Sequence, residues 1–230
     1  MKKIIIFGDN PIAQMLYEDM LRHSSKAFDV VAFTVDEGFL KADTFCGKPL
    51  VSFREIKNLF PPDEYAIIST VDAPSKMRNR LEVFARIKAE GYSTPNYISP
   101  LADVSDSIIM SENNLIMAFA CVGSGGRMGD ANFIRQNTYL GHNFVIGNGN
   151  TISAGCTIAG CCTFGDSSYI GIGATLIDHL RVANDTLIGA GAVVIRDTEP
   201  CTKYVGNPAK PIGKHESTGV MIDMRATRVD

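Results

Sequence analysis

The sequence predicts a two-part fold, with a small parallel α/β sheet in residues 1–98 and a solenoid of short stacked strands in residues 99–213. Two observations predict it. Every sixth residue from Val104 to Val194 is large and apolar, and a period this regular is typical of repeat architectures. In the first part, apolar strands instead alternate with helical segments, which is typical of a parallel sheet. Residues 214–230 are expected to form a C-terminal tail.

The elements of the first part can be placed by residue type. Residues 3–7 form a continuous apolar strand that ends at Gly8 and Asp9. Asn10 can cap a helix that begins at Pro11, because proline suits the first helical position. The remaining expected elements are strands over 28–35 and 65–69 and a helix over 77–91 that ends at a glycine.

Small and polar residues gather at the carboxyl end of each of these strands. Because ligands of parallel α/β sheets bind beyond the carboxyl ends of the strands, these residues form a candidate binding site. The set comprises Gly8, Asp9, Asn10, Thr34, Asp36, Ser69 and Thr70. A dinucleotide-binding motif would read Gly-x-Gly-x-x-Gly, and only Gly8 is present, so NAD chemistry is disfavoured. A tight turn followed by an ordinary Asn-Pro helix cap explains the turn residues equally well.

Each six-residue unit of the second part is interpreted as one short strand and one corner. The residue after the large apolar one is usually small, as are Gly141 and Gly147, which suits a sharply bent backbone. The residue two positions before it is also usually small, as are Cys156 and Ala174, so small and large inward residues alternate. A helix would need a period of 3.6 residues, so strands stacked about 4.8 Å apart are the better interpretation.

Composition excludes several classes of function. The chain has 230 residues, a net charge of -3 and a pI near 5.8, which gives no electrostatic case for nucleic acid or an anionic membrane. Its apolar runs are too short for a membrane span or a signal peptide, so a cytoplasmic protein is expected. Cys156, Cys161 and Cys162 lie in the repeat without metal-ligand spacing, so we interpret them as structural and expect no metal.

The repeated apolar-small-x-x-small-x pattern resembles the hexapeptide-repeat acyltransferases, in which three units close one coil of a left-handed parallel β-helix. The segment Tyr-Val-Gly-Asn-Pro-Ala-Lys-Pro-Ile over 204–212 is similar to the tail of those enzymes. The whole layout, with a linker at 97–100, resembles the sugar acyltransferases of the sialic-acid-cluster and bacillosamine-pathway type. The resemblance implies a Rossmann-like sugar-nucleotide-binding domain in 1–98 and a left-handed β-helix acyltransferase domain in 99–213.

The resemblance also implies an activity and an assembly. The expected activity is acetyl-CoA-dependent N-acetylation of the amino group of a UDP-, dTDP- or GDP-linked amino-deoxy sugar, for surface-polysaccharide or glycan biosynthesis. The N-terminal site would hold this acceptor, and a homotrimer would bind coenzyme A between subunits. A sugar O-acetyltransferase, a longer acyl donor and a non-catalytic trimeric sugar-nucleotide-binding scaffold remain alternatives. A β-helical carbonic anhydrase needs three converging histidines, and the repeat holds only His142 and His179.

Acyl transfer to an amine needs a base, and histidine suits that role because its ordinary pKa lies near neutral pH. His142 occupies a polar corner of the repeat, where a histidine is usually only a solvated surface residue. The resemblance implies instead that it is the base, since the family's base has the same Gly-His-x-x-x-Ile-Gly setting. Many relatives have an acidic residue next, but this chain has Asn143. We therefore expect a backbone carbonyl or another carboxylate to orient the ring, with an orienting role for Asn143 itself as the alternative.

Residues one or more coils away complete the predicted site. Gly160 lies eighteen residues beyond His142, so its N–H is expected to stabilise the developing oxyanion. His179 lies about 10 Å along the axis from His142, and we expect it to border the groove of a neighbouring chain. The resemblance places the following residues on the coenzyme A path, with Thr151 replacing a histidine of the family: Thr151, Gly160, Ile172, Ala190 and Lys210.

Overall fold

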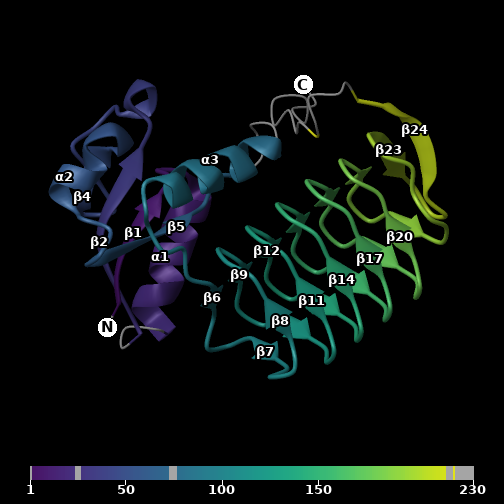
Figure 1. Ribbon diagram of the computed structural model, residues 1–230. Helices are drawn as coiled ribbons and strands as arrows, with labels where there is room; N and C mark the ends of the chain where they lie inside the picture. The colour runs from purple at the N-terminus through teal and green to yellow at the C-terminus, as the bar shows by residue number, and fades with distance from the viewer. Residues whose placement is uncertain (1, 24–26, 73–76, 216–219, 221–230) are drawn as a thin grey trace.

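The computed structural model describes residues 2–23, 27–72, 77–215 and 220. Figure 1 shows an α/β sheet on one side and a stack of coils on the other, with helix α3 (Arg78–Ala89) reaching from the first toward the second. The chain therefore has the two kinds of architecture that the sequence predicts.

The N-terminal sheet has the strand order β3-β4-β2-β1-β5. All neighbours pair in parallel except β3 and β4, so the parallel sheet predicted from strand-helix alternation is confirmed. Strand β4 was not expected from the sequence. The elements are β1 (Lys2–Phe7), α1 (Pro11–His23), β2 (Phe28–Val35), η1 (Glu37–Phe39), β3 (Thr44–Phe45), β4 (Lys48–Ser52), η2 (Phe53–Glu55), α2 (Ile56–Leu59), β5 (Tyr65–Ser69) and α3.

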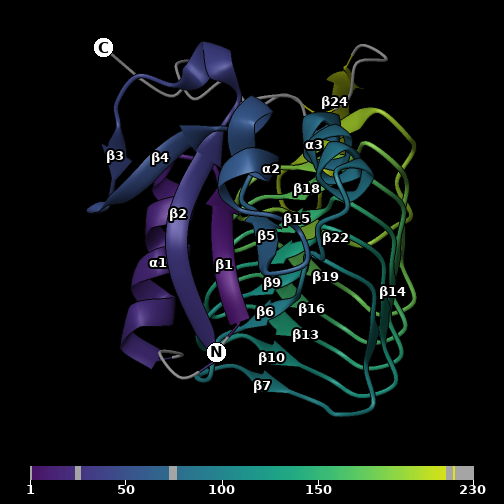
Figure 2. The same cartoon turned by 60° about the vertical axis from the view of Figure 1, so that its left-hand side comes forward.

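Both faces of this sheet are covered, as Figure 2 shows. Ile4 of β1 packs in one core with Leu16 of α1, and Ile5 packs in another with Ile87 of α3. A strand buried on both faces needs apolar residues at successive positions rather than alternate ones. This explains the continuous apolar run of β1.

From Tyr97 onward the chain forms three parallel sheets, which are the three sides of the coils. The first sheet has the order β22-β19-β16-β13-β10-β7, the second β20-β17-β14-β11-β8, and the third β24-β23-β21-β18-β15-β12-β9-β6. Between β6 and β22 paired residues are eighteen apart, as Cys121 and Tyr139 are, so the predicted coil of three hexads is confirmed. The third sheet already starts with β6, within the range predicted for the N-terminal domain.

The strands of these sheets are short and regularly spaced. Their bounds are β6 (Tyr97–Ile98), β7 (Asp103–Val104), β8 (Ile109–Met110), β9 (Leu115–Ile116), β10 (Cys121–Val122), β11 (Arg127–Met128), β12 (Phe133–Ile134), β13 (Tyr139–Leu140), β14 (Val145–Ile146), β15 (Thr151–Ile152), β16 (Thr157–Ile158), β17 (Thr163–Phe164), β18 (Tyr169–Ile170), β19 (Thr175–Leu176), β20 (Arg181–Val182), β21 (Leu187–Ile188), β22 (Val193–Val194), β23 (Thr202–Val205) and β24 (Lys210–Lys214). Strand β24 turns back antiparallel to β23 and ends the third sheet.

The interior of the coils departs from the small-large alternation at one corner. Phe144 stands where a small inward residue is usual, and its side chain is fully buried. Gly126, one coil earlier, leaves the space for it, because a Cβ there would lie 2.1 Å from Cζ of the phenyl ring. The aromatic ring is accommodated by the glycine of the adjacent coil, so the stack stays regular at this point.

A column of buried asparagines runs along the corner between the second and third sheets. Asn114, Asn132 and Asn150 are fully buried and eighteen residues apart. Oδ1 of Asn132 accepts from the backbone N–H and from Nδ2 of Asn150, at 2.9 and 3.1 Å. Its Nδ2 donates to Oδ1 of Asn114 and to the carbonyl of Gly147. The column therefore pairs backbone groups that the bent corners leave without a strand partner.

We predict that Asn132→Ala destabilises the coils. It would leave the buried N–H of Asn150 and the carbonyl of Gly147 without these partners, and each such loss costs about 1–3 kcal/mol. The midpoint of thermal unfolding, followed by circular dichroism at one protein concentration, should fall by several degrees. Thr157→Ala, at an exposed position of β16, is the control. Equal midpoints for the two variants would contradict a stabilising role for the column.

Candidate active site

His142 lies at the corner between β13 and β14, in the coil formed by residues 139–156. Its exposed position follows from its neighbours. A Cβ at Gly141 would lie 2.7 Å from the backbone N of Gly160, so the next coil leaves no room for a side chain there. Asn143 has a φ of 54°, which asparagine adopts more readily than most residues, and Phe144 then returns to the core. The turn thus leaves His142 on the outside of the corner.

The imidazole of His142 is oriented by the side chain that follows it. Nδ1 of His142 lies 2.9 Å from Oδ1 of Asn143. Since an amide oxygen only accepts, this contact assigns the ring proton to Nδ1 and leaves the lone pair of Nε2 available. Of the orienting groups considered from the sequence, it is Asn143 itself that contacts the ring within the described residues, and not a backbone carbonyl or a carboxylate. A neutral amide does the orienting instead.

Gly160 provides the space in which the ring of His142 lies. A Cβ at Gly160 would be 2.6 Å from Nε2 of His142, so any larger residue would displace the imidazole. The carbonyl of Gly160 accepts from the N–H of His179 at 3.0 Å, whereas its own N–H has no hydrogen-bond partner within the described residues. The structure therefore brings a basic nitrogen and an N–H donor together at the interface of two coils.

His179 lies further along the same corner. Its Nδ1 is 3.0 Å from Oδ2 of Asp178, and both side chains are well exposed. Asp178 falls in the column of His142 and Gly160, two coils beyond the histidine. The spacing of stacked strands separates the two imidazoles by about 10 Å. That distance excludes direct proton exchange between His142 and His179 of one chain.

The residues assigned to the coenzyme A path lie elsewhere. Ile172 and Ala190 are exposed at the corner between the third and first sheets, and Lys210 is exposed on β24. Within the described residues the N–H groups of Ile172 and Ala190 have no hydrogen-bond partner, so they are available as donors. The first sheet separates this corner from that of His142. One chain therefore does not bring the two groups of residues together.

Thr151 does not lie where a coenzyme A contact would require it. Its side chain is fully buried at the junction of the two domains. Its hydroxyl lies 2.7 Å from Nη2 of Arg80 and 3.1 Å from Oδ1 of Asp72. This position contradicts the prediction that Thr151 contacts the cofactor, because a ligand would first have to displace an ion pair.

Three residues of the N-terminal candidate site form a contiguous edge at the ends of β1 and β5. Gly8 has a φ of 135°, and a Cβ there would lie 2.4 Å from Oγ1 of Thr70. Asn10 accepts from the N–H of Ala13 at 2.9 Å, which caps α1, and its Nδ2 donates to the carbonyl of Thr70 at 3.3 Å. Glycine is therefore required next to Thr70, and Asn10 joins the helix start to β5.

The other residues of that set have different surroundings. Asp9 is exposed and Asp36 is half-buried, where it forms an ion pair with Arg86 of α3. Thr34, Ser69 and Thr70 are all buried, so their side chains support the edge from behind. The hydroxyl of Thr34 donates to the carbonyl of Val51. The prediction of ligand contacts is thus contradicted for the side chains of Thr34, Ser69 and Thr70.

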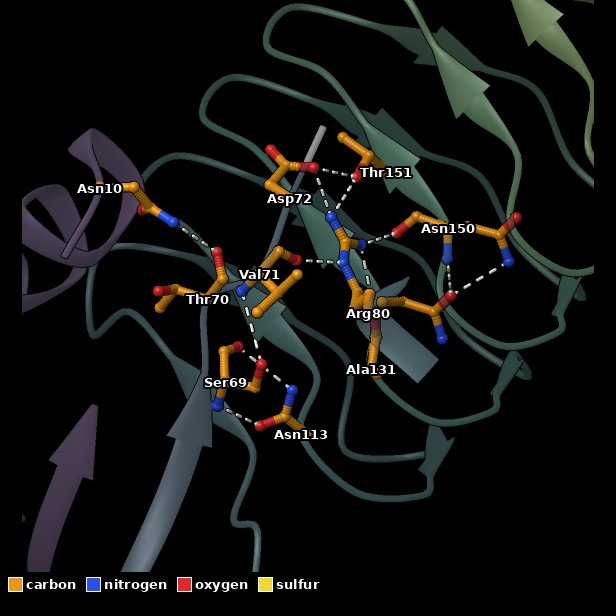
Figure 3. Close-up of polar contacts among 11 residues, drawn as sticks. Asn10, Ser69, Thr70, Val71, Asp72, Arg80, Asn113, Ala131, Asn150 and Thr151 are labelled. Atoms are coloured by element: carbon orange, nitrogen blue, oxygen red, sulfur yellow. Dashed lines mark hydrogen bonds and ion pairs between the residues drawn. The ribbon is translucent and has the colours of Figure 1, made fainter. Parts of the chain in front are cut away.

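Three residues at the junction of the domains, namely Asp72, Arg80 and Asn113, were not identified from the sequence. Figure 3 shows Arg80 between Asp72 and the coils, and Asn113 beside Ser69. Oδ1 of Asn113 accepts from the N–H of Ser69 at 2.8 Å, and its Nδ2 donates to the Ser69 carbonyl. The eighteen-residue spacing of asparagines in the sequence was a signal for the neighbouring column. No comparable pattern marks Arg80, which in sequence resembles any polar helix residue.

The buried cysteines of the repeat are poor candidates for reactive chemistry. All six cysteines are free, and burial raises the pKa of the Cys156 thiol to about 11, so it is a poor nucleophile. Within the described residues no cluster of three metal-ligating side chains occurs. None of the described helices combines the length and apolar character that a membrane crossing needs.

Comparisons with known proteins relate parts of the sequence to acetyltransferases. No protein-family model matches the chain. A putative acetyltransferase of Schizosaccharomyces pombe is 44% identical over 52 residues, 23% of this chain and 25% of that protein. Serine acetyltransferase 3 of Arabidopsis thaliana mitochondria is 41% identical over 49 residues, 21% of this chain and 12% of that protein. The match thus spans a quarter or less of the length of these curated relatives.

Solved structures are similar over nearly the whole chain. The acetyltransferase domain of PglB from Neisseria gonorrhoeae superposes with a TM-score of 0.83 at 24% identity, covering 92% of this chain and 100% of that one. PerB from Caulobacter crescentus, in complex with CoA and GDP-perosamine, gives 0.82 at 23% identity, covering 93% and 98%. WeeI from Acinetobacter baumannii gives 0.79 at 23% identity, covering 92% and 100%. The chain has the fold of these left-handed β-helix proteins.

Proposed function

We propose that the chain is an acetyl-CoA-dependent N-acetyltransferase that acts on the amino group of a nucleotide-linked amino-deoxy sugar. The observation that carries this proposal is the pairing of His142 with Gly160. An oriented imidazole with an available Nε2 lies at an exposed corner beside an N–H that has no partner in the described part of the chain. These two groups supply what transfer of an acyl group from a thioester to an amine requires.

The proposed reaction needs only these groups and the two substrates. The acceptor amine attacks the thioester carbonyl, a C–N bond forms, and the N–H of Gly160 stabilises the resulting oxyanion. Nε2 of His142 takes the proton that the amine nitrogen loses. The C–S bond then breaks, and the departing thiolate takes up that proton to give free CoA and the amide. Asn143 keeps the ring in the required tautomer throughout.

The similar structures support both substrate assignments. PglB's acetyltransferase domain has been solved in complex with acetyl coenzyme A, and a mutant of the perosamine N-acetyltransferase of Caulobacter crescentus in complex with CoA and GDP-perosamine. For this chain we propose that the edge formed by Gly8, Asn10 and the backbone of Thr70, together with the carboxylate of Asp36 directly after β2, binds the nucleotide-sugar acceptor. The corner of Ile172 and Ala190 and the side chain of Lys210 would bind the donor.

We predict that His142→Ala lowers kcat by about 10²- to 10⁴-fold, the usual contribution of a positioned general base. Acetyl transfer to a panel of UDP-, dTDP- and GDP-linked amino sugars, followed by thiol release, would measure it. Thermal-shift titration with CoA should give the same affinity as for the wild-type protein. A variant that keeps more than half of the wild-type kcat would reject the base assignment. A wild-type protein that binds sugar nucleotides but acetylates none would favour a scaffold.

Asn143 offers a matched variant for the same assay. Asn143→Gly removes the amide without strain, because glycine tolerates the positive φ of this position. Loss of an orienting group usually costs about 10- to 100-fold, so kcat should fall less than in the histidine variant. A larger fall for Asn143→Gly than for His142→Ala would mean that the amide itself contacts the substrates.

We predict that Asp36→Ala raises the KM of the acceptor roughly tenfold or more, as loss of one charge-assisted hydrogen bond does. The KM of acetyl-CoA should stay nearly unchanged, since the donor would bind the coils. Glu37→Ala, which removes an adjacent exposed carboxylate paired with Arg54, is the control. Asp36 is a sharper probe than Asn10, whose removal would also uncap α1. Equal increases in the KM of the acceptor and the KM of acetyl-CoA would contradict the assignment of the acceptor to the N-terminal domain and the donor to the coils.

We predict that the active species is a homotrimer, because the corners of His142 and of Ile172 are separated within one chain. Light scattering should report three times the chain mass of 24.9 kDa. Phe119 lies at the same corner as Ile172, between the third and first sheets, and is 62% exposed. Phe119→Asp should therefore weaken assembly and activity together. Ile109→Asp, at a comparably exposed position of β8, is the control. A fully active monomer at micromolar concentration would contradict the prediction.

A further inference from the structure

Arg80 is a buried cation that joins the two domains. Its side chain is 4% exposed, and that of its partner Asp72 is 8% exposed. Burial lowers the pKa of the Arg80 guanidinium, while the neighbouring carboxylate of Asp72 acts in the opposite direction. Buried ion pairs are often no more stabilising than apolar residues of similar size. Stability alone therefore does not account for a charge at this point.

The contacts of Arg80 divide between the domains, as Figure 3 shows. Toward the N-terminal domain, Nε donates to the carbonyl of Val71 at 2.7 Å and Nη2 to the carboxylate of Asp72. Toward the coils, Nη1 donates to the carbonyl of Asn150 at 3.0 Å, and Nη2 to the hydroxyl of Thr151 at 2.7 Å. The planar guanidinium thus fixes both partners in direction as well as in distance.

The residues that Arg80 contacts in each domain are close in sequence to groups of the proposed reaction. Asn150 and Thr151 belong to the coil of residues 139–156, which also carries His142. Val71 and Asp72 directly follow Thr70, whose carbonyl accepts from Asn10 on the acceptor edge. Because adjacent coils are about 4.8 Å apart, a shift of the domains by one coil would misplace the acceptor by that distance. Errors of about 1 Å in substrate placement can already cost 100-fold in rate.

We propose that Arg80 is a positioning residue for acetyl transfer. It sets the acceptor edge at the height of the coil that carries His142, so that the bound amine reaches the thioester in line with Nε2. This inference rests on the proposed function and adds to it the group that fixes the relative placement of the two substrates.

The test is the turnover rate per coenzyme-A-binding site, measured at saturating substrates on the full-length protein. The wild-type protein must first acetylate a member of the nucleotide-sugar panel, and its failure to do so would reject the proposed function rather than the role of Arg80. In the active protein, Arg80→Met should lower this rate by roughly tenfold or more without changing CoA affinity. Arg80→Lys keeps the positive charge but not the planar guanidinium with its several N–H donors, and it should give an intermediate rate.

Two further variants separate positioning from folding. A triple variant, Asp72→Leu with Arg80→Met and Thr151→Val, replaces the polar bridge by apolar side chains and should fold at least as well as Arg80→Met. Its rate per CoA-binding site should remain as low. Arg78→Met removes another interdomain ion pair, to Asp185, and should leave the rate within about twofold of wild type. Wild-type rates per site in the triple variant, or equal losses for Arg78→Met and Arg80→Met, would overturn the proposal.

Discussion

The hydrogen bonds between successive coils are the interaction on which the rest of the structure depends. The N–H of Gly141 donates to the carbonyl of Ile158, and the N–H of Tyr139 to that of Cys156, each one coil further on. This register makes every corner a column of residues spaced by eighteen. It forces Gly160 beneath His142, and a side chain at residue 160 would occupy the place of the imidazole. The proposed base and oxyanion donor are thus a direct product of the stacking.

The same columns also provide the surface on which the N-terminal domain rests. Leu81 of α3 lies against Gly149, where a Cβ would be 2.9 Å from its Cγ. Lys88 pairs with Glu112 near the start of the coils, and Arg78 with Asp185 further along. Helix α3 therefore follows the corner that holds the asparagine column. The contacts that glycine, asparagine amide and guanidinium groups make at this corner determine which coils lie next to the C-terminal end of β5.

The sequence predicted those features that a period or a residue type determines locally. The apolar residues at every sixth position led directly to the coils, and Gly8 with Asn10 and Pro11 led to the turn before α1. It missed β4, whose Lys-Pro start is untypical of an inner strand, and it misplaced Thr151. A family correspondence assigned that residue to the cofactor, but burial under Arg80 depends on the docking of two domains. Docking leaves no periodic signal, so Arg80 and Asn113 were not found either.

The separation of the two exposed corners constrains how the proposed reaction can be assembled. The imidazole of His142 lies at one edge of the first sheet of a chain. The N–H groups of Ile172 and Ala190, which no other described residue pairs with, lie at the opposite edge. A donor held along the second corner would meet the base of the first only if another copy supplied one of them. The domain contacts through Arg80 act within a chain and set height along the axis. Assembly must then set the remaining direction, around the axis, so intrachain docking and subunit contacts have complementary roles in placing the substrates.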